Sequence, residues 1–152
     1  MKLSTKGRYG LRAMIDLAVH DDEDVNCTQT IAQRQGISES YLEQLFRLMK
    51  KAGLVVSVRG AGGGYRLARP ADSISVGDVL RAMEGDVNAV ACPALHEEDG
   101  CEGSSFCVTK TVWKKINDAI SETVDNIMLE ELASESRALL EKKGASVPVC
   151  AN

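Results

Sequence analysis

The sequence lacks any long uninterrupted run of apolar residues, and its first residues contain neither a signal-peptide core nor a small-residue cleavage site. A membrane-spanning helix needs about 18 or more such residues, so we expect a cytoplasmic protein without a membrane segment. Histidine is nearly absent, with only His20 and His96. Neither has an identifiable catalytic partner, and no nucleophile–base set is recognisable, so we predict that the protein is not an enzyme.

The five cysteines show neither the paired C-x-x-C spacing of structural zinc sites nor the ligand runs of ferredoxins. An odd number in a chain without a secretion signal favours free thiols or metal ligands over a disulfide framework. Cys92, Cys101 and Cys107 lie in one polar stretch, with gaps of eight and five residues. Such close thiols indicate a soft-metal site, with three unrelated thiols as the alternative. We expect Cys27 to be a small buried side chain and Cys150 to be incidental.

The composition is that of a soluble globular domain, with 152 residues, 44% hydrophobic and 26% charged. The net charge of −4 is unfavourable for nucleic-acid binding, but it is unevenly distributed. Residues 1–70 carry 11 Lys and Arg against 7 Asp and Glu, whereas residues 71–152 carry 7 against 15. A basic front half can approach phosphates while the acidic half faces away. Chance scatter of surface charge is the alternative.

Three short helices are predicted in the first third of the chain. Apolar residues at helical spacing indicate the first between Tyr9 and His20, and Thr28 is expected to cap a second that ends at Gly36. Ser38 caps the third, whose polar face carries Ser40, Tyr41, Glu43, Gln44, Arg47 and Lys51. The second and third helices match helix-turn-helix geometry, with a helical hairpin bearing a solvated face as the alternative.

A β-hairpin with a glycine tip follows. Residues 54–58 and 65–67 are strand-like, and Arg59-Gly60-Ala61-Gly62-Gly63-Gly64 joins them. A nucleotide-binding loop would lead into a helix and carry the Gly-Lys-Ser/Thr ending or the spaced glycines of a dinucleotide fold, and this loop has neither. We therefore interpret the hairpin as a wing. Its candidate DNA-contacting residues are Arg59, Gly60, Gly62, Gly63 and Tyr65, and Thr28 and Ser38 are further candidates at the helix starts.

The second half of the chain predicts a capped helix, an irregular segment and a long amphipathic helix. Ser75 and Asp78 form a capping box for a helix that ends at Gly85. Apolar periodicity resumes from Val108 to Ile127, about five helical turns. Because no second long helix is available to pack against it, we expect this helix to pair with its own copy in a homodimer. Packing on its own domain is the alternative.

The predicted fold is mostly α with a small β-hairpin wing. We divide the chain into a winged helix-turn-helix DNA-binding domain at 1–85 and a cysteine-rich sensor loop at 86–107. A dimerisation helix and a short terminal helix follow at 108–143, and residues 144–152 are expected to form a flexible tail.

Several stretches resemble the IscR, NsrR and CymR family of bacterial transcription regulators. They are MKLSTKGRYGLRAMIDLA, ISESYLEQLFRLMKKAGLVVSVRGAGGGYRLARP, ISVGDVLRAMEG, and the cysteine loop that leads into a helix containing Trp113. The resemblance covers roughly residues 1–135. It implies a homodimer that binds double-stranded operator DNA, with the helix from Ser38 to Lys51 in the major groove and Arg59 in the minor groove.

In IscR-like and NsrR-like members, three loop cysteines hold an iron–sulfur cluster, which implies ligand roles for Cys92, Cys101 and Cys107 and a cluster of the 2Fe–2S or 4Fe–4S type. CymR-like members lack these cysteines. The sequence departs from the family pattern at the remaining ligand, because the IscR-like histidine is Lys110 and the NsrR-like carboxylate falls at Arg8. Both are charged and poor iron ligands, so we favour His96 of the loop as the fourth ligand. A loop carboxylate, a group from the partner subunit and an exchangeable external ligand are the alternatives.

The leading hypothesis is a repressor or activator whose operator binding is controlled by a cluster or by the redox state of the three loop cysteines. A zinc-based or thiol-based regulator without a cluster is one alternative. An iron–sulfur scaffold that does not bind DNA is another, and in such a protein a basic wing would have no purpose.

Overall fold

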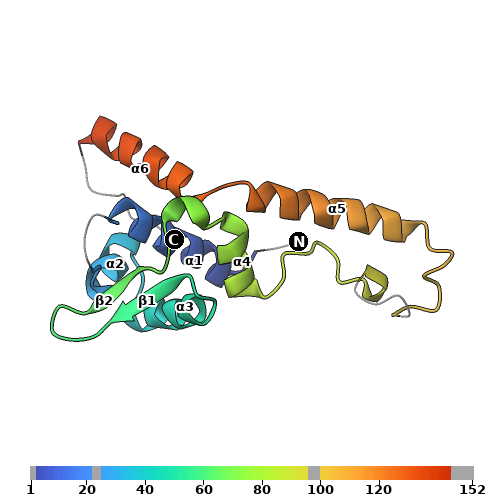
Figure 1. The fold of residues 1–152 in the computed structure, drawn as a ribbon, viewed down its shortest axis with the longest axis horizontal. Coiled ribbons are helices and arrows are strands. Elements are labelled where there is room, and N and C mark those ends of the chain that lie inside the picture. Colours follow the sequence, from blue (N-terminus) through green and yellow to red (C-terminus); the bar gives the residue numbers. More distant parts are fainter. Residues whose placement is uncertain (1–2, 22–24, 96–99, 145–152) are drawn as a thin grey trace.

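The computed structural model describes residues 3–21, 25–95 and 100–144. Over these residues the chain forms six α-helices and one antiparallel hairpin (Figure 1). In chain order they are α1 (Thr5–Val19), α2 (Thr28–Gln35), α3 (Glu39–Lys51), β1 (Val55–Val58), β2 (Gly64–Leu67), α4 (Val76–Glu84), α5 (Thr109–Asp125) and α6 (Leu129–Lys143), with short 3-10 turns η1 (Ala71–Ser73) and η2 (Pro93–Leu95). The mostly α fold with a small hairpin, predicted from the sequence, is confirmed.

Helices α1 to α4 and the base of the hairpin surround one apolar core. Apolar residues recur every three to four positions along α3, and the face they form is buried. They are Leu42, Leu45, Phe46 and Met49. The core also receives Leu129 and Ala133 from α6, both with no exposed surface. Helix α6 therefore completes the core that α1 to α4 and the hairpin form.

Helix ends follow the predicted local signals except at the starts of α1 and α2. The Ser38 hydroxyl accepts a hydrogen bond from the N–H three residues later, and Ser75 and Asp78 form both bonds of a capping box. The expected cap at Thr28 is wrong. Cys27 occupies the cap position of α2 without a side-chain cap bond, because Thr28 already has helical backbone geometry as the first residue of the helix.

Helix α1 begins at Thr5, earlier than the predicted start at Tyr9. The Ser4 hydroxyl accepts a hydrogen bond from the Gly7 N–H at 3.4 Å, which satisfies one of the free donors at the helix start. The same hydroxyl donates to Glu84 Oε1 at 2.6 Å. The bond to Glu84 at the end of α4 thus stabilises the first turn of α1, which the apolar pattern alone does not predict.

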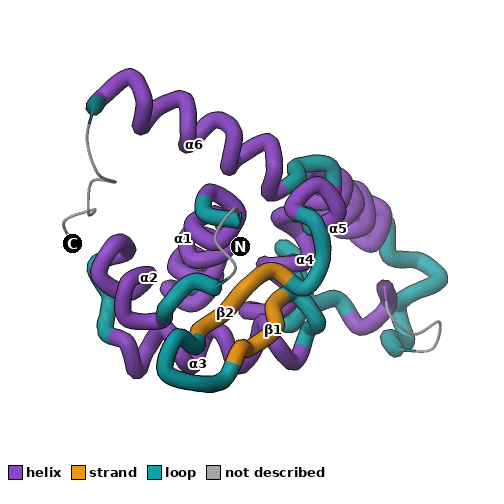
Figure 2. The backbone as a smooth tube through the Cα atoms, turned by 60° about the vertical axis from the view of Figure 1, so that its left-hand side comes forward, coloured by secondary structure: helices purple, strands orange, loops and turns teal. Residues whose placement is uncertain are grey.

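Helix α5 projects from the winged core, whereas α6 folds back along α1 (Figures 1 and 2). Arg137 of α6 donates to the carbonyl oxygens of Ala18 at 2.6 Å and Val19 at 3.3 Å, at the end of α1. The C-terminal end of α5 is attached to α4 by paired hydrogen bonds of 2.7 and 2.8 Å between Arg81 and Asp125. None of the helices described is both long and apolar enough to cross a membrane.

Candidate nucleic-acid interface and cysteine loop

The polar face of α3 is open to solvent. Of the α3 residues predicted to contact DNA, those exposed are Ser40, Glu43, Gln44, Arg47 and Lys51. Tyr41 is half-buried, and its ring meets that of Tyr9 edge-on with 6.0 Å between centroids. Burial is the main cause that raises the pKa of Tyr41, so its phenol stays protonated and able to donate a hydrogen bond at neutral pH.

Sequence reasoning missed Lys50, which joins α3 to the wing. Its Nζ donates to the Ser57 hydroxyl of β1 at 2.7 Å, and its side chain is exposed. The signal was available, because Lys50 lies three residues after Arg47 and therefore shares its face of the helix.

The wing tip depends on glycine at two positions. Gly60 has a φ of 118°, which favours glycine, and its carbonyl accepts a hydrogen bond from the Gly63 N–H at 3.0 Å. A Cβ on Gly63 would lie only 2.5 Å from the carbonyl oxygen of Val58. Arg59 is exposed immediately before this closed turn. The wing tip therefore exposes the Arg59 side chain beside a backbone turn closed by the Gly60–Gly63 hydrogen bond.

Tyr65 fixes the wing to the rest of the domain. Its ring stacks on that of Phe46 from α3, with 4.3 Å between centroids and 21° between planes. Its backbone exchanges two hydrogen bonds, of 3.0 and 2.9 Å, with Asn26. A Cβ on the neighbouring Gly64 would collide with the Asn26 carbonyl oxygen. Tyr65 thus belongs to the base of the wing, and its predicted DNA contact stays a prediction.

A buried polar network connects this base to α1 and α2, and sequence reasoning missed it. The Asp16 side chain, 1% exposed, accepts hydrogen bonds from Arg34 Nε at 2.9 Å and Gln35 Nε2 at 2.7 Å. Arg34 also donates to Asn26 Oδ1 at 3.1 Å, and the Asn26 amide donates to the His20 carbonyl at 3.1 Å. The available signal was a lone carboxylate within the apolar stripe of α1.

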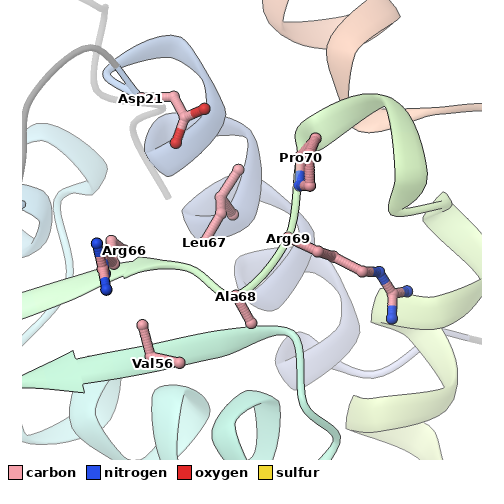
Figure 3. A pocket seen from close by; sticks show the side chains of 7 residues that line it. All are labelled: Asp21, Val56, Arg66, Leu67, Ala68, Arg69 and Pro70. Atoms are coloured by element: carbon pink, nitrogen blue, oxygen red, sulfur yellow. The ribbon is translucent and has the colours of Figure 1, made fainter.

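A cavity of about 430 Å³ lies beside β2 (Figure 3). Its lining residues are Asp21, Val56, Arg66, Leu67, Ala68, Arg69 and Pro70. The guanidinium of Arg69 pairs with Asp78 at 2.8 Å. None of the predicted site residues lines this cavity.

The three predicted cluster ligands lie on the cysteine loop, residues 86–107. Cys92 is half-buried, Cys101 and Cys107 are exposed, and all three are free thiols. Among the residues that the structure describes, no three His, Cys, Asp or Glu side chains converge as a metal site. His96 and Cys150, with the rest of the predicted tail from 145 onward, lie outside the described residues.

Cys107 lies just before α5. Its Sγ is 3.0 Å from the Thr109 hydroxyl, and this hydrogen bond is the main cause that lowers the pKa of the Cys107 thiol, with help from the Lys110 N–H. Lys110 itself donates from Nζ to the Ser104 hydroxyl at 3.0 Å. Cys27, expected to be buried, is exposed, because it lies in the turn before α2 rather than on a core-facing helical position.

The apolar stripe of α5 divides into two parts. Ile120 and Val124 pack on α4 residues Val76 and Leu80 of the same subunit. Towards the start of the helix, four large side chains are exposed by 90%, 82%, 48% and 38%, respectively Phe106, Val108, Val112 and Ile116. We call these four residues the exposed stripe.

Residues 3–135 match the Rrf2 family, whose description is iron-dependent transcriptional regulator. The chain belongs to the Rrf2 family. It is 49% identical over 132 residues to the HTH-type transcriptional regulator IscR of Aliivibrio salmonicida, which covers 87% of this chain and 77% of that regulator. The predicted family is therefore confirmed.

Solved structures of this family share the fold of the Rrf2 chain. The structure of T. potens IscR has 45% sequence identity and a TM-score of 0.70, covering 91% of this chain and 90% of that one. CymR, the global cysteine regulator of B. subtilis, has 43% identity and a TM-score of 0.72, covering 89% and 98%. The relatives are named as transcriptional regulators, so the prediction of a non-enzymatic function is also confirmed.

Proposed function

We propose that this Rrf2 protein is a cytoplasmic, homodimeric transcription regulator whose binding to operator DNA is controlled by an iron–sulfur cluster held by Cys92, Cys101 and Cys107. One observation carries the proposal. Along the chain, a loop with three free thiols follows the solvent-exposed helix-turn-helix face and the glycine-tipped wing. The same loop precedes α5. A change at the loop therefore acts between the DNA-reading part and the helix that pairs subunits.

DNA binding rests on the charge and exposure of α3 and the wing. Arg47, Lys50, Lys51 and Arg59 are exposed cations that can neutralise phosphates. Gln44 and Arg47 carry the side chains that read adenine and guanine edges in a major groove. The glycine tip lets the wing backbone approach the duplex closely, with Arg59 in the minor groove.

The homodimer rests on the exposed stripe. Four large apolar side chains exposed on the first half of α5 and just before it need a covering surface, and the same segment of a second copy supplies one with matching chemistry. Two subunits then present two α3 helices to a palindromic operator.

The cluster assignment rests on donor chemistry. Thiolates are the ligands that iron–sulfur clusters prefer, and the three loop thiols are free and reachable from solvent. They do not converge among the described residues, so cluster binding would draw the three thiols together. When bound, the cluster supplies the sensitivity to redox state or to iron supply. His96 remains the fourth ligand we favour.

The test is an anaerobic absorption spectrum of freshly purified protein, compared with Cys92→Ala, Cys101→Ala and Cys107→Ala. Each of the three changes should abolish the visible sulfur-to-iron charge-transfer bands. Cys27→Ala is the matched control, since Cys27 is exposed but lies before α2, and it should keep the bands. His96→Ala should shift the bands or shorten their lifetime.

Operator binding is then measured with cluster-loaded and cluster-free protein. A difference in affinity supports control by the cluster, and equal affinities overturn it. A colourless protein that contains zinc, or one with no metal and reversible thiol oxidation, would favour the corresponding alternative regulator. A coloured protein without affinity for any duplex would favour the scaffold.

A further inference from the structure

Asn117 is the only buried residue of α5, a helix whose residues are all described. It is 8% exposed, whereas the apolar residues of the same helix are half-buried or exposed. A polar side chain at the most buried position of an amphipathic helix needs hydrogen-bond partners. Asn117 finds both of its partners on the cysteine loop.

The two bonds use both ends of the amide. Asn117 Oδ1 accepts from the Ala89 N–H at 2.9 Å, and Nδ2 donates to the Val90 carbonyl at 3.4 Å. Val90 lies two residues before Cys92, whose own carbonyl accepts from the Leu95 N–H at 3.0 Å in the η2 turn. The backbone on both sides of Cys92 is thus hydrogen-bonded, on one side to α5 itself.

Helix α5 continues from Asn117 to a second attachment point. Asp125, eight residues later or about 12 Å along the helix, forms the two-bond ion pair with Arg81 of α4. Figure 1 shows the loop running beside the projecting part of α5 before the chain enters that helix. A displacement of the Cys92 segment therefore has a short, hydrogen-bonded route to α4 and the winged domain.

We propose that Asn117 is the positioning residue that couples Cys92 to α5, so that ligation or release at Cys92 moves the helix. The inference rests on the proposed function of Cys92 as a ligand. Neither aspartate nor alanine can replace the amide of Asn117. Aspartate at this position accepts from Ala89 but cannot donate to Val90, and alanine leaves both backbone groups without their partner.

The first test measures Cys92 in the full-length, metal-free protein with Cys27, Cys101, Cys107 and Cys150 changed to serine. The rate of reaction of Cys92 with a maleimide should rise about tenfold in Asn117→Ala, because loss of two hydrogen bonds lets the half-buried segment open more often. Asn117→Asp should give a smaller rise. Asn126→Ala is the control, since Asn126 lies next to α5, is exposed and bonds only to Glu122.

The second test reads the coupling itself. Trp113, the single tryptophan, lies one helical turn before Asn117 and reports on α5. Maleimide attached to Cys92 should shift Trp113 emission in the same four-serine protein with Asn117 intact, and in that protein carrying Asn126→Ala. The shift should be lost in Asn117→Ala. Far-UV circular dichroism verifies that each variant keeps its helices. If Asn117→Ala loses helix content, Asn117→Asp takes its place in the emission measurement.

Unchanged Cys92 reactivity in both Asn117 variants would overturn the positioning role, and an equal Trp113 shift in Asn117→Ala would overturn the coupling. Neither readout needs a cluster. If the wild-type protein forms no cluster anaerobically, the proposed function fails while these tests still decide the role of Asn117. In cluster-loaded protein, Asn117→Ala should shorten the lifetime of the visible bands in air severalfold, and Asn126→Ala should not.

Discussion

Glu84, the last residue of α4, accepts hydrogen bonds from both the N–H and the hydroxyl of Ser4, at 3.0 and 2.6 Å. The Ser4 hydroxyl is the main cause that lowers the pKa of Glu84, and the N–H groups of Ser4 and Gly7 add to it against the opposing effect of burial. Gly7 leaves room for the carboxylate, since a Cβ there would lie 2.5 Å from Glu84 Oε1. The start of α1 is therefore held by an ionised group.

This pair predicts a pH-dependent stability. Because the folded-state pKa of Glu84 is lowered, its contribution to the free energy of unfolding is present above the ordinary value of 4.5 and is lost as pH falls through the folded-state pKa. Glu84→Gln should cost about 1–2 kcal/mol near neutral pH. Urea unfolding at a series of pH values should show the two proteins converging at acid pH, and a gap that stays constant would contradict the assignment.

Arg59→Ala should weaken DNA binding and reduce the slope of log affinity against log salt by about one unit, because one phosphate or minor-groove contact is lost. Lys142→Ala is the matched control, since it removes an exposed cation on α6, away from the wing. Fluorescence anisotropy with an operator duplex measures both. Equal slopes in the Arg59 variant and the wild type would count against the wing contact.

Ile116→Asp should produce monomers that keep native helix content, because the side chain is 38% exposed within one subunit and a charge there opposes pairing. Thr111→Asp places the same charge at an exposed position of α5 outside the exposed stripe and should leave dimers intact. Val124→Asp should behave differently again and destabilise the subunit itself, since Val124 packs on α4. Analytical ultracentrifugation and thermal unfolding separate these cases, and a dimeric Ile116→Asp would refute the pairing surface.

Gly64→Ala should displace the wing from the domain. The added methyl group would collide with the Asn26 carbonyl, which must move and break its bond with the Tyr65 N–H, at a cost of about 1–3 kcal/mol. Gly62→Ala is the control, because nothing lies within 4 Å of a Cβ there. The temperature of thermal unfolding should fall for Gly64→Ala and stay unchanged for Gly62→Ala, and the operator affinity of Gly64→Ala should fall as well.

Features with a local cause could be predicted from the sequence. The cap at Ser38, the capping box at Ser75 and the left-handed turn at Gly36 follow from residues at most a few positions apart. The wing could be predicted for the same reason, because a glycine-rich turn between two strand-like stretches is typical of a β-hairpin.

Features that join distant segments could not be predicted in this way. The early start of α1 depends on Glu84, 80 residues from Ser4, and apolar periodicity contains no information about that bond. The two backbone hydrogen bonds between Asn26 and Tyr65 join segments 39 residues apart, and no local pattern indicates them. The burial of Asn117 depends on the path of an irregular loop, which has no periodic pattern to interpret.

The contact between Arg137 and the end of α1 has a consequence for how the protein is made. The carbonyls of Ala18 and Val19 leave the ribosome early, but the side chain that bonds to them is synthesised 118 residues after Val19. Leu129 and Ala133, which complete the same core, arrive only shortly before it. The part of the core that Leu129 and Ala133 cover therefore stays open until α6 has been synthesised, and only then is the core of α1 to α4 complete.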